Sequence, residues 1–306
     1  MKKYILIIIS IIVIVLLALG FFFLYPKLTE SKDINGMIML IEFEKIDGIL
    51  QWEKELDSKG INALVKAQGN ILNEYPEVFK RLADKGYEIA GGYDGAPFWD
   101  MPYDQQYQLM EEAKQLVEGV TGKTMKVFGS RYFAYDENTL KAADALGVEY
   151  VLARGTAGER AIVYKPEEYK VKILSVSNIP FEEMGTGSLC DYSLWARGAS
   201  AEDFEKVLNG CIDKSPDNMI LVSHAYLGGT RLAWWNVYQK ALNSEDITWK
   251  GFNDWIDNLN PLVLSNKDIP VNREVKYEVP KPAVAIEDLE PIPGLGEEET
   301  FCPTCY

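Results

Sequence analysis

Strand-like and helix-like segments alternate along most of this 306-residue chain, and this alternation constrains the fold more than any other feature of the sequence. The first strand is predicted over residues 37–44, an apolar run between a polar spacer and a turn expected at Asp47 and Gly48. Further strand and helix patterns follow in turn as far as Leu264. Such alternation predicts a mainly parallel sheet of βα units, in barrel or open form.

Short apolar runs and helical periodicity define the remaining expected elements. Pro76 suits the first turn of a helix, Ser200 is a good N-cap, and Gly86 and Gly147 suit helix ends. The other strands are expected at residues 61–66, 87–90, 125–128, 149–153, 171–174, 188–190, 219–224 and 262–264. The helices are expected at residues 76–85, 103–120, 136–146, 201–211, 232–242 and 249–259.

Two carboxylates stand at the end of the first predicted strand. Because strand side chains alternate between faces, Glu42 and Glu44 share a face with Ile38 and Leu40. One interpretation is that both acids leave the sheet into solvent. The other is that they point into a site at the C-terminal end of the strand, where α/β proteins place their chemistry.

An apolar segment without charges occupies residues 4–24, which is long enough to cross a bilayer as a helix. Lys2 and Lys3 precede it and favour a cytoplasmic N-terminus. The sequence therefore predicts an uncleaved anchor over residues 1–25, a spacer over 26–36, and a domain outside the cytoplasm. A cleaved signal peptide is the competing interpretation, although no A-x-A cleavage pattern follows.

The charge and cysteine content restrict the partners of the chain. A formal net charge of −15 argues against nucleic acid, which requires a basic surface. Residues 278–306 form an acidic, proline-rich tail that ends in C-P-T-C and is expected to be extended or disordered, with an unknown partner. Outside the cytoplasm disulfides are permitted, and we expect Cys190 to pair with Cys211.

Several segments resemble the polysaccharide deacetylase family, in the family's order and spacing. The segments that carry the resemblance are residues 73–90 (NEYPEVFKRLADKGYEIA), residues 103–128 with their Thr-Gly-Lys, residues 135–147 (YDENTLKAADALG), Asp191 to Trp195 (DYSLW) and residues 219–224 (MILVSH). The resemblance covers residues 37–264 and implies a distorted (β/α) barrel of fewer than eight strands. It places the barrel domain at residues 37–277.

The metal-binding motifs of that family are not kept. The resemblance places its general base at Glu44, but its first metal ligand falls at Lys45, and its two histidine ligands fall at Gly92 and Ala96. No cofactor or metal is therefore expected. A substitute all-oxygen site would have to use the carboxylates of Glu42, Glu44, Asp94 and Asp100.

The resemblance also supplies the candidate site residues. Its catalytic positions correspond to Glu44, His224, Arg131 and Asp191. Aromatic side chains near these positions are candidates for stacking on a sugar ring, or for plugging the barrel mouth instead. They are Tyr93, Trp99, Tyr132, Trp195, Tyr226 and Trp234.

The resemblance thus implies a membrane-anchored, extracytoplasmic domain that binds an N-acetylated cell-surface glycan, with weak or no metal-dependent hydrolysis. Two alternatives remain open. One is an active carbohydrate deacetylase with a rearranged carboxylate and His224 site, and the other is a non-catalytic interaction scaffold.

Overall fold

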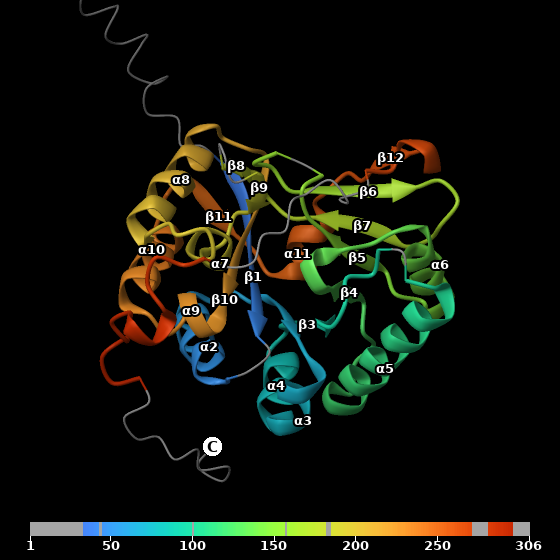
Figure 1. Cartoon of the computed structure of the whole chain (residues 1–306), viewed down its shortest axis with the longest axis horizontal. Helices are drawn as coiled ribbons and strands as arrows, with labels where there is room; N and C mark the ends of the chain where they lie inside the picture. The colour runs from blue at the N-terminus through green and yellow to red at the C-terminus, as the bar shows by residue number, and fades with distance from the viewer. Residues whose placement is uncertain are drawn as a thin grey trace, which may run out of the picture.

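A curled, mixed β-sheet forms the centre of the domain (Figure 1). The computed structural model describes residues 33–42, 45–99, 101–156, 158–181, 185–270 and 281–295. The strands are β1 (Ile34–Glu42), β2 (Leu64–Ala67), β3 (Glu88–Tyr93), β4 (Val127–Ser130), β5 (Tyr150–Ala153), β6 (Ile162–Pro166), β7 (Lys172–Ser175), β8 (Asn178–Phe181), β9 (Gly185–Ser188), β10 (Asn218–His224), β11 (Ile247–Trp249) and β12 (Leu262–Leu264). In space their order is β10-β1-β2-β3-β4-β5-β7-β6-β12, with β11 beside the start of β1 and β8 paired with β9.

Helices pack around this sheet. They are α2 (Asp47–Lys59), α3 (Gly69–Glu74), α4 (Pro76–Asp84), α5 (Tyr103–Thr121), α6 (Glu137–Leu146), α7 (Asp191–Trp195), α8 (Ala201–Asp213), α9 (Ala225–Gly228), α10 (Leu232–Leu242) and α11 (Phe252–Asp257). Most of them cover the outer face of the sheet, whereas Phe252 and Trp255 of α11 pack into the interior of the curl. In Figure 1, α2, α8, α9 and α10 lie on one side of β1, and α5 and α6 lie on the other. The predicted α/β fold is confirmed.

The sheet is a curled half-barrel, so the predicted barrel is not closed. Every ladder from β10 to β5 is parallel, whereas β6 runs antiparallel to β7. Within the described ranges, no strand ladder joins β12 back to β10. A hydrogen bond from Ala161 N to Asn218 O (2.8 Å) and a bridge between Cys190 and Val222 bring the intervening chain against β10.

The two faces of β1 belong to two apolar clusters. Ile38 and Leu40 pack outward with the helices, whereas Met39 and Ile41 face the interior of the curl. Glu42 falls on the outward face, is completely buried, and accepts a hydrogen bond from the Lys45 backbone N–H at 3.3 Å. Neither sequence interpretation therefore holds for Glu42, because this side chain reaches neither solvent nor the interior. Glu44 lies outside the described residues.

Helix α2 replaces the turn that was expected at Asp47 and Gly48. Its buried residues, Ile49, Trp52 and Leu56, recur at helical spacing and pack into the outer cluster. A Cβ on Gly48 would lie 1.9 Å from the backbone oxygen of Ala225. The glycine thus allows close packing of α2 on α9 rather than marking a turn.

The acidic tail is attached to the domain over residues 281–295. Lys281 N donates to Ala196 O at 2.8 Å, and Ile292 N donates to Thr230 O at 2.9 Å. Ile286 and Leu289 pack against the outer apolar cluster. This part of the tail is extended but anchored, and the C-P-T-C sequence lies outside the described residues.

None of the helices in the described ranges has the length and apolar character needed to cross a bilayer. The anchor predicted over residues 1–25 lies outside these ranges.

Candidate functional site

A cavity of about 390 Å³ opens at the C-terminal ends of the parallel strands. Its wall is made by side chains that follow or end β1, β2, β3, β4, β5, β9 and β10. They are Ile41, Lys66, Gln68, Asp94, Ser130, Arg131, Tyr132, Phe133, Arg154, Ser188, Cys190, Tyr192, Ser193, Ala196, Arg197, Val222 and His224. The end of a parallel sheet is where α/β folds place ligand sites, because loops of several strands meet there.

Strand register sets the spacing of the two ionisable groups that end β2 and β10. Ile41 pairs with Lys66 on one side and with His224 on the other. Since Ile41 faces the interior and neighbouring strands are about 4.8 Å apart, Lys66 and His224 stand on the interior face about 10 Å from each other. The register therefore brings a buried amine and an imidazole to opposite walls of one cavity.

Lys66 is buried inside the curl with a single carboxylate partner. Its side chain is 2% exposed, and its Nζ lies 2.8 Å from Asp94 Oδ2. The Gln68 amide also donates to Asp94 Oδ2. Burial works against the charged form of Asp94, but Lys66 and Gln68 outweigh it and hold the pKa of this carboxyl below its ordinary value.

Glycines make room for the Lys66 side chain. A Cβ on Gly92 would lie 3.4 Å from Lys66 Cε and 2.8 Å from the backbone oxygen of Ala67. A Cβ on Gly129 would lie 3.2 Å from both Cδ and Cε of Lys66. Lys66 thus fills the space into which a side chain at position 92 would project.

The residues present do not fit the metal site of the polysaccharide deacetylase family. Gly92 and Ala96 offer no imidazole, and the Lys66 ammonium lies where a ligand from position 92 would reach. A divalent cation beside this ammonium would be repelled in a poorly solvated interior. The substitute site of four carboxylates is not assembled either, because Glu42 points outward and Asp94 is bound to Lys66. Glu44 and Asp100 lie outside the described residues.

A buried carboxylate, Asp191, organises the wall that contains His224. It is completely buried at the start of α7. Its Oδ1 accepts from the backbone N–H groups of Tyr192 (2.6 Å) and His224 (2.9 Å), and its Oδ2 accepts from Ser223 Oγ (2.9 Å). Trp52 Nε1 donates in turn to Ser223 Oγ at 3.3 Å. These donors satisfy a buried anion that would otherwise be costly.

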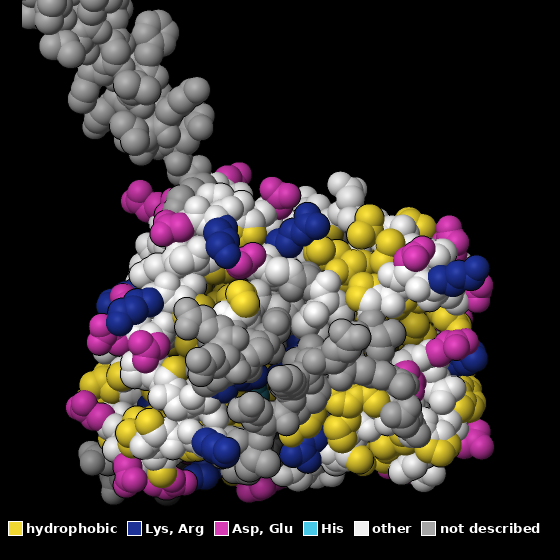
Figure 2. Space-filling view, turned by 45° about the horizontal axis from the view of Figure 1, so that its top comes forward, with side chains coloured by type: hydrophobic (Ala, Val, Ile, Leu, Met, Phe, Trp, Pro, Cys, Tyr) yellow, Lys and Arg dark blue, Asp and Glu magenta, His cyan; other side chains and the backbone are white. Residues whose placement is uncertain are grey.

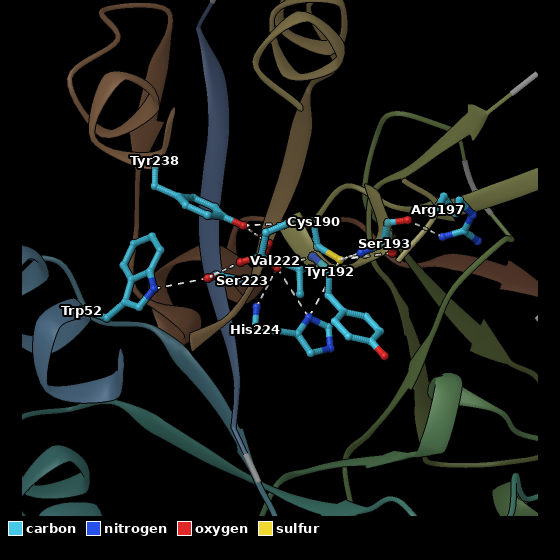
Figure 3. Close-up of polar contacts among 10 residues, drawn as sticks. Trp52, Cys190, Tyr192, Ser193, Arg197, Val222, Ser223, His224 and Tyr238 are labelled. Carbon is cyan, nitrogen blue, oxygen red and sulfur yellow. Dashed lines mark hydrogen bonds and ion pairs between the residues drawn. The ribbon is translucent and has the colours of Figure 1, made fainter. Parts of the chain in front are cut away.

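His224 lies between this carboxylate and the cavity. Its Nδ1 is 3.6 Å from Asp191 Oδ1 and 4.0 Å from Cys190 Sγ, and its side chain is 15% exposed. The ring lies 4.6 Å from the Tyr192 ring, at 32°, and the two rings are side by side in Figure 3. Burial disfavours the imidazolium, but hydrogen bonding to Asp191 and Cys190, together with the negative charge of Asp191, raises the pKa of His224 to about 9. The ring is therefore a proton donor at neutral pH.

Cys190, Asp191 and His224 are the one group in the described residues whose ligand atoms lie close enough to share an ion, within 4.8 Å of one another. The Asp191 oxygens already accept three hydrogen bonds, and Cys190 Sγ accepts from Ser193 N at 3.2 Å. The cluster is thus a hydrogen-bonded support for His224.

The predicted disulfide between Cys190 and Cys211 is wrong. Both are free, buried thiols. Cys211 Sγ donates to Glu159 O at 3.7 Å, while Cys190 faces Ser193 and His224. Positions at the end of a strand and the end of a later helix do not make two cysteines face each other. Successive side chains of a helix point in different directions around its axis, so most of them point away from any given strand residue.

Arg131, Tyr132 and Phe133 form a strained single turn after β4. Tyr132 and Phe133 have φ values of 60° and 53°, a left-handed conformation that costs roughly 1–3 kcal/mol per non-glycine residue. Arg131 donates to the backbone oxygen of Gly95 at 3.2 Å. The Arg131 and Arg154 guanidinium carbons lie 5.0 and 5.4 Å from the centre of the Tyr132 ring. The turn therefore directs Arg131 and Tyr132 to the cavity.

The predicted aromatic residues fall into three groups. Tyr132 lines the cavity, and Tyr226 packs edge-on against His224 with ring centres 5.9 Å apart. Tyr93 and Trp99 are absent from the cavity wall, and Tyr93 packs on Phe98 at 5.6 Å in the outer cluster.

The two remaining aromatic predictions are corrected by the structure. Trp195 is held by the C-terminal segment, because its Nε1 donates to Val284 O at 2.8 Å. Trp234 is 2% exposed and packs against Phe204 in the outer cluster. Trp234 therefore stabilises α10 on the sheet and cannot stack on a ligand in the cavity.

Several cavity residues have no counterpart in the predicted site, and four of them carry a charge or a phenol ring beside the predicted residues. They are Lys66, Arg154, Tyr192 and Arg197. Lys66 is the last residue of one predicted strand, and Arg154 directly follows another. A cation at the end of a predicted strand is the sequence pattern that could have identified both as site residues. For Arg197, which lies after α7, no local pattern indicates a role.

Comparisons with known proteins agree with this architecture. The sequence profile of the family described as polysaccharide deacetylase matches residues 51–151. No curated protein matches the chain at a significant level. Residues 51–151 therefore resemble the polysaccharide deacetylase family.

Solved structures share the fold at low identity. One, assigned as a polysaccharide deacetylase from Mycobacterium smegmatis, has a TM-score of 0.55 and 13% identity over 74% of this chain and 93% of that chain. An allantoinase has a TM-score of 0.56 and 14% identity over 74% of this chain and 91% of that chain. A mutant of a CE4-family pseudoenzyme with restored enzymatic activity has a TM-score of 0.51 and 10% identity, over 74% and 69% of the two chains.

Proposed function

We propose that this chain is a membrane-anchored, extracytoplasmic protein whose polysaccharide deacetylase-like domain binds an N-acetylated cell-surface glycan, with weak or no metal-dependent hydrolysis. The observation that carries the proposal is the Lys66–Asp94 ion pair against Gly92 and Gly129, beside an accessible cavity that ends at His224.

Gly92 and Ala96 provide no imidazole ligands, and this reduces the rate of hydrolysis that the site can support. A bound ion lowers the pKa of its water from about 15.7 to about 7 and polarises the carbonyl that is attacked. General acid–base catalysis alone contributes roughly 10²- to 10⁴-fold. Lys66 supplies a positive charge but cannot activate water while it is protonated. A site with these residues is therefore better suited to binding than to rapid amide hydrolysis.

The cavity has the features that a sugar ring requires. Tyr132 and Tyr192 present aromatic faces, which stack on the apolar side of sugars. Ser130, Ser193 and Gln68 present polar groups among them. A CE4-family pseudoenzyme has a similar fold, so a domain of this shape can occur without enzymatic activity.

Binding and turnover of chitotetraose by the full-length protein in mild detergent test this proposal. We expect measurable binding by titration calorimetry, less than one equivalent of bound metal, and little acetate release with or without a chelator. A Lys206→Gln variant, changed on the exposed surface of α8, is the control for nonspecific effects. Robust acetate release that a chelator abolishes would contradict the proposal.

The location of the domain is part of the proposal and needs its own test. The uncharged segment over residues 4–24 supports an anchor with the remainder outside. Protease added to intact cells should then remove the domain. A mature protein that begins near Lys27 and is free of membrane would indicate a cleaved signal peptide instead.

A second candidate is a hydrolase that works without a metal. His224, held by Asp191 and protonated at neutral pH, favours it because a general acid must carry its proton. In that case Glu44 would act as the base. Chelator-insensitive turnover that is lost in both Glu44→Gln and His224→Ala would support this candidate.

A further inference from the structure

The ammonium of Lys66 has more N–H donors than the surrounding protein uses. An ammonium group carries three donors. Among the described residues, Asp94 Oδ2 is the one acceptor that Lys66 Nζ contacts, at 2.8 Å. The Lys66 side chain is 2% exposed and belongs to the wall of the cavity. Because a buried donor gains free energy when it finds an acceptor, the other donors favour a ligand oxygen in the cavity.

The stem of Lys66 is held in place by two paired glycines. Lys66 is part of β2, and Gly92 of β3 pairs with Gly129 of β4. The positions that a Cβ would take on these glycines lie 3.2–3.4 Å from Cδ or Cε of Lys66. The stem therefore runs across β3 toward β4, packed against both strands. A ligand that contacts this ammonium loses less conformational entropy than one that must order a mobile lysine.

The charge of the ion pair favours a neutral acceptor. Asp94 is the one acid among the described residues that line the cavity, and it already offsets the positive charge of Lys66. The Asp and Glu side chains in view in Figure 2 lie mostly toward the edge of the molecule. An anionic ligand group would compete with Asp94 for the ammonium, whereas an amide carbonyl oxygen can accept from a remaining donor and leave the pair intact.

We propose that Lys66 donates a hydrogen bond to the carbonyl oxygen of the ligand's acetamide group, and that this contact makes the cavity selective for N-acetylated sugars. This inference rests on the proposed glycan-binding function and adds the residue that recognises the acetyl group. Tyr132 and Tyr192 line the same cavity, and their ring faces suit the apolar side of the sugar. The cavity volume of about 390 Å³ falls within the range of small-molecule sites.

Titration calorimetry on the full-length protein in mild detergent, with chitotetraose and cellotetraose as ligands, measures this selectivity. Both ligands are neutral tetrasaccharides with the same linkage, but cellotetraose carries a hydroxyl where chitotetraose carries an acetamide. We expect chitotetraose to bind at least about tenfold more tightly, as one hydrogen bond from a charged donor provides. Since neither ligand is charged, added salt should leave the ratio of the two affinities nearly unchanged.

Substitution of Lys66 connects the selectivity to this contact. Lys66→Met removes the donors but keeps much of the length of the stem. It should reduce the ratio of the two affinities by about tenfold, mainly by weakening the binding of chitotetraose. Lys80→Met, the same change at an exposed residue of α4 outside the cavity, should leave the ratio unchanged. Tryptophan fluorescence establishes that each variant is folded before the titration.

Infrared spectroscopy of the wild-type protein tests the same contact if Lys66→Met does not fold. Chitotetraose with isotopically labelled acetyl carbonyl carbons gives a carbonyl band that is separate from the protein bands. A hydrogen bond from an ammonium is stronger than one from water, so part of this band should shift below its frequency in water when the ligand binds. A bound ligand whose carbonyl band does not shift overturns the proposal.

The outcomes separate this inference from the function on which it rests. Equal affinity for the two tetrasaccharides, or a ratio that folded Lys66→Met keeps, overturns the acetamide contact but leaves glycan binding intact. Binding of N-methylacetamide that depends on Lys66, without binding of either tetrasaccharide, supports the contact and refutes the glycan function. No binding of any of these ligands refutes both.

Discussion

Replacing Lys66 with methionine would test the central feature of the site. Methionine keeps much of the length of the side chain but removes the ammonium from Asp94, 2.8 Å away. Removing one partner of a fully buried pair costs about 3–5 kcal/mol. Asp94 is 22% exposed and keeps the Gln68 contact, so we expect a smaller loss of about 2–3 kcal/mol in the free energy of unfolding at neutral pH.

The pH dependence of this loss follows from Asp94. Its pKa is held below the ordinary value in the folded protein, so its contribution to stability is present above the unfolded pKa of about 3.9. It is lost as the pH falls through the folded pKa, when the carboxylate becomes protonated. The difference between wild type and Lys66→Met should therefore be greatest at neutral pH and shrink below about pH 4.

Urea unfolding of the full-length protein in mild detergent, followed by tryptophan fluorescence at neutral and acidic pH, measures this difference. Lys80→Met is the matched control, because Lys80 forms an exposed pair with Asp84 in which both side chains are more than 50% accessible. Such pairs contribute only about 0.3–0.5 kcal/mol. Equal stability of Lys66→Met and wild type at neutral pH would show that the buried ion pair is absent.

Three further predictions concern the opposite wall and the core. In Asp191→Asn the imidazole loses its charged partner, so NMR titration should give a His224 pKa well below the wild-type value of about 9. The wild-type protein should lose stability between about pH 6.5 and 9, as His224 gives up its proton, and the variant should not lose stability in that range. Trp234→Ala should lower the free energy of unfolding, measured with a chemical denaturant, by about 3–5 kcal/mol, because it empties a buried site. A decrease below about 1 kcal/mol would contradict this burial and make Trp234 a candidate ligand contact again. Mass spectrometry without reductant should find Cys190 and Cys211 unpaired, and alkylation of Cys211, whose pKa burial raises to about 12, should require unfolding.

Local sequence patterns predicted most of the framework. The helix predicted at 103–120 is α5 (Tyr103–Thr121), and the strand at 219–224 is β10 (Asn218–His224). Ser200 caps α8 by accepting from Asp203 N, and Gly147 ends α6 with a φ of 71°. Caps and periodicity succeed because they depend on residues only a few positions apart.

Some elements were missed although their signal was present. Ile49, Trp52 and Leu56 have helical spacing, but Asp47 and Gly48 were interpreted as a turn. Asp47 is instead the first residue of α2, and Gly48 is required where α2 packs on α9. The reason for that glycine lies almost 180 residues away, at Ala225, so no local rule could identify it.

The candidate site likewise combines features that the sequence predicted with features that depend on long-range contacts. The sequence alone, through the family resemblance, indicated His224, Asp191 and Arg131 and the loss of imidazoles at Gly92 and Ala96. It determined the types of residue available for chemistry and the strands that carry them.

Which of those residues come into contact depends on the tertiary structure. Lys66 and Asp94 are 28 residues apart, yet strand register and the glycines beside them bring the pair together inside the curl. In the sequence alone, Trp234 cannot be distinguished from an aromatic residue that stacks on a ligand, but the packing of α10 on Phe204 buries it. Burial and long-range pairing depend on the whole fold, because each is set by what other segments place opposite a side chain.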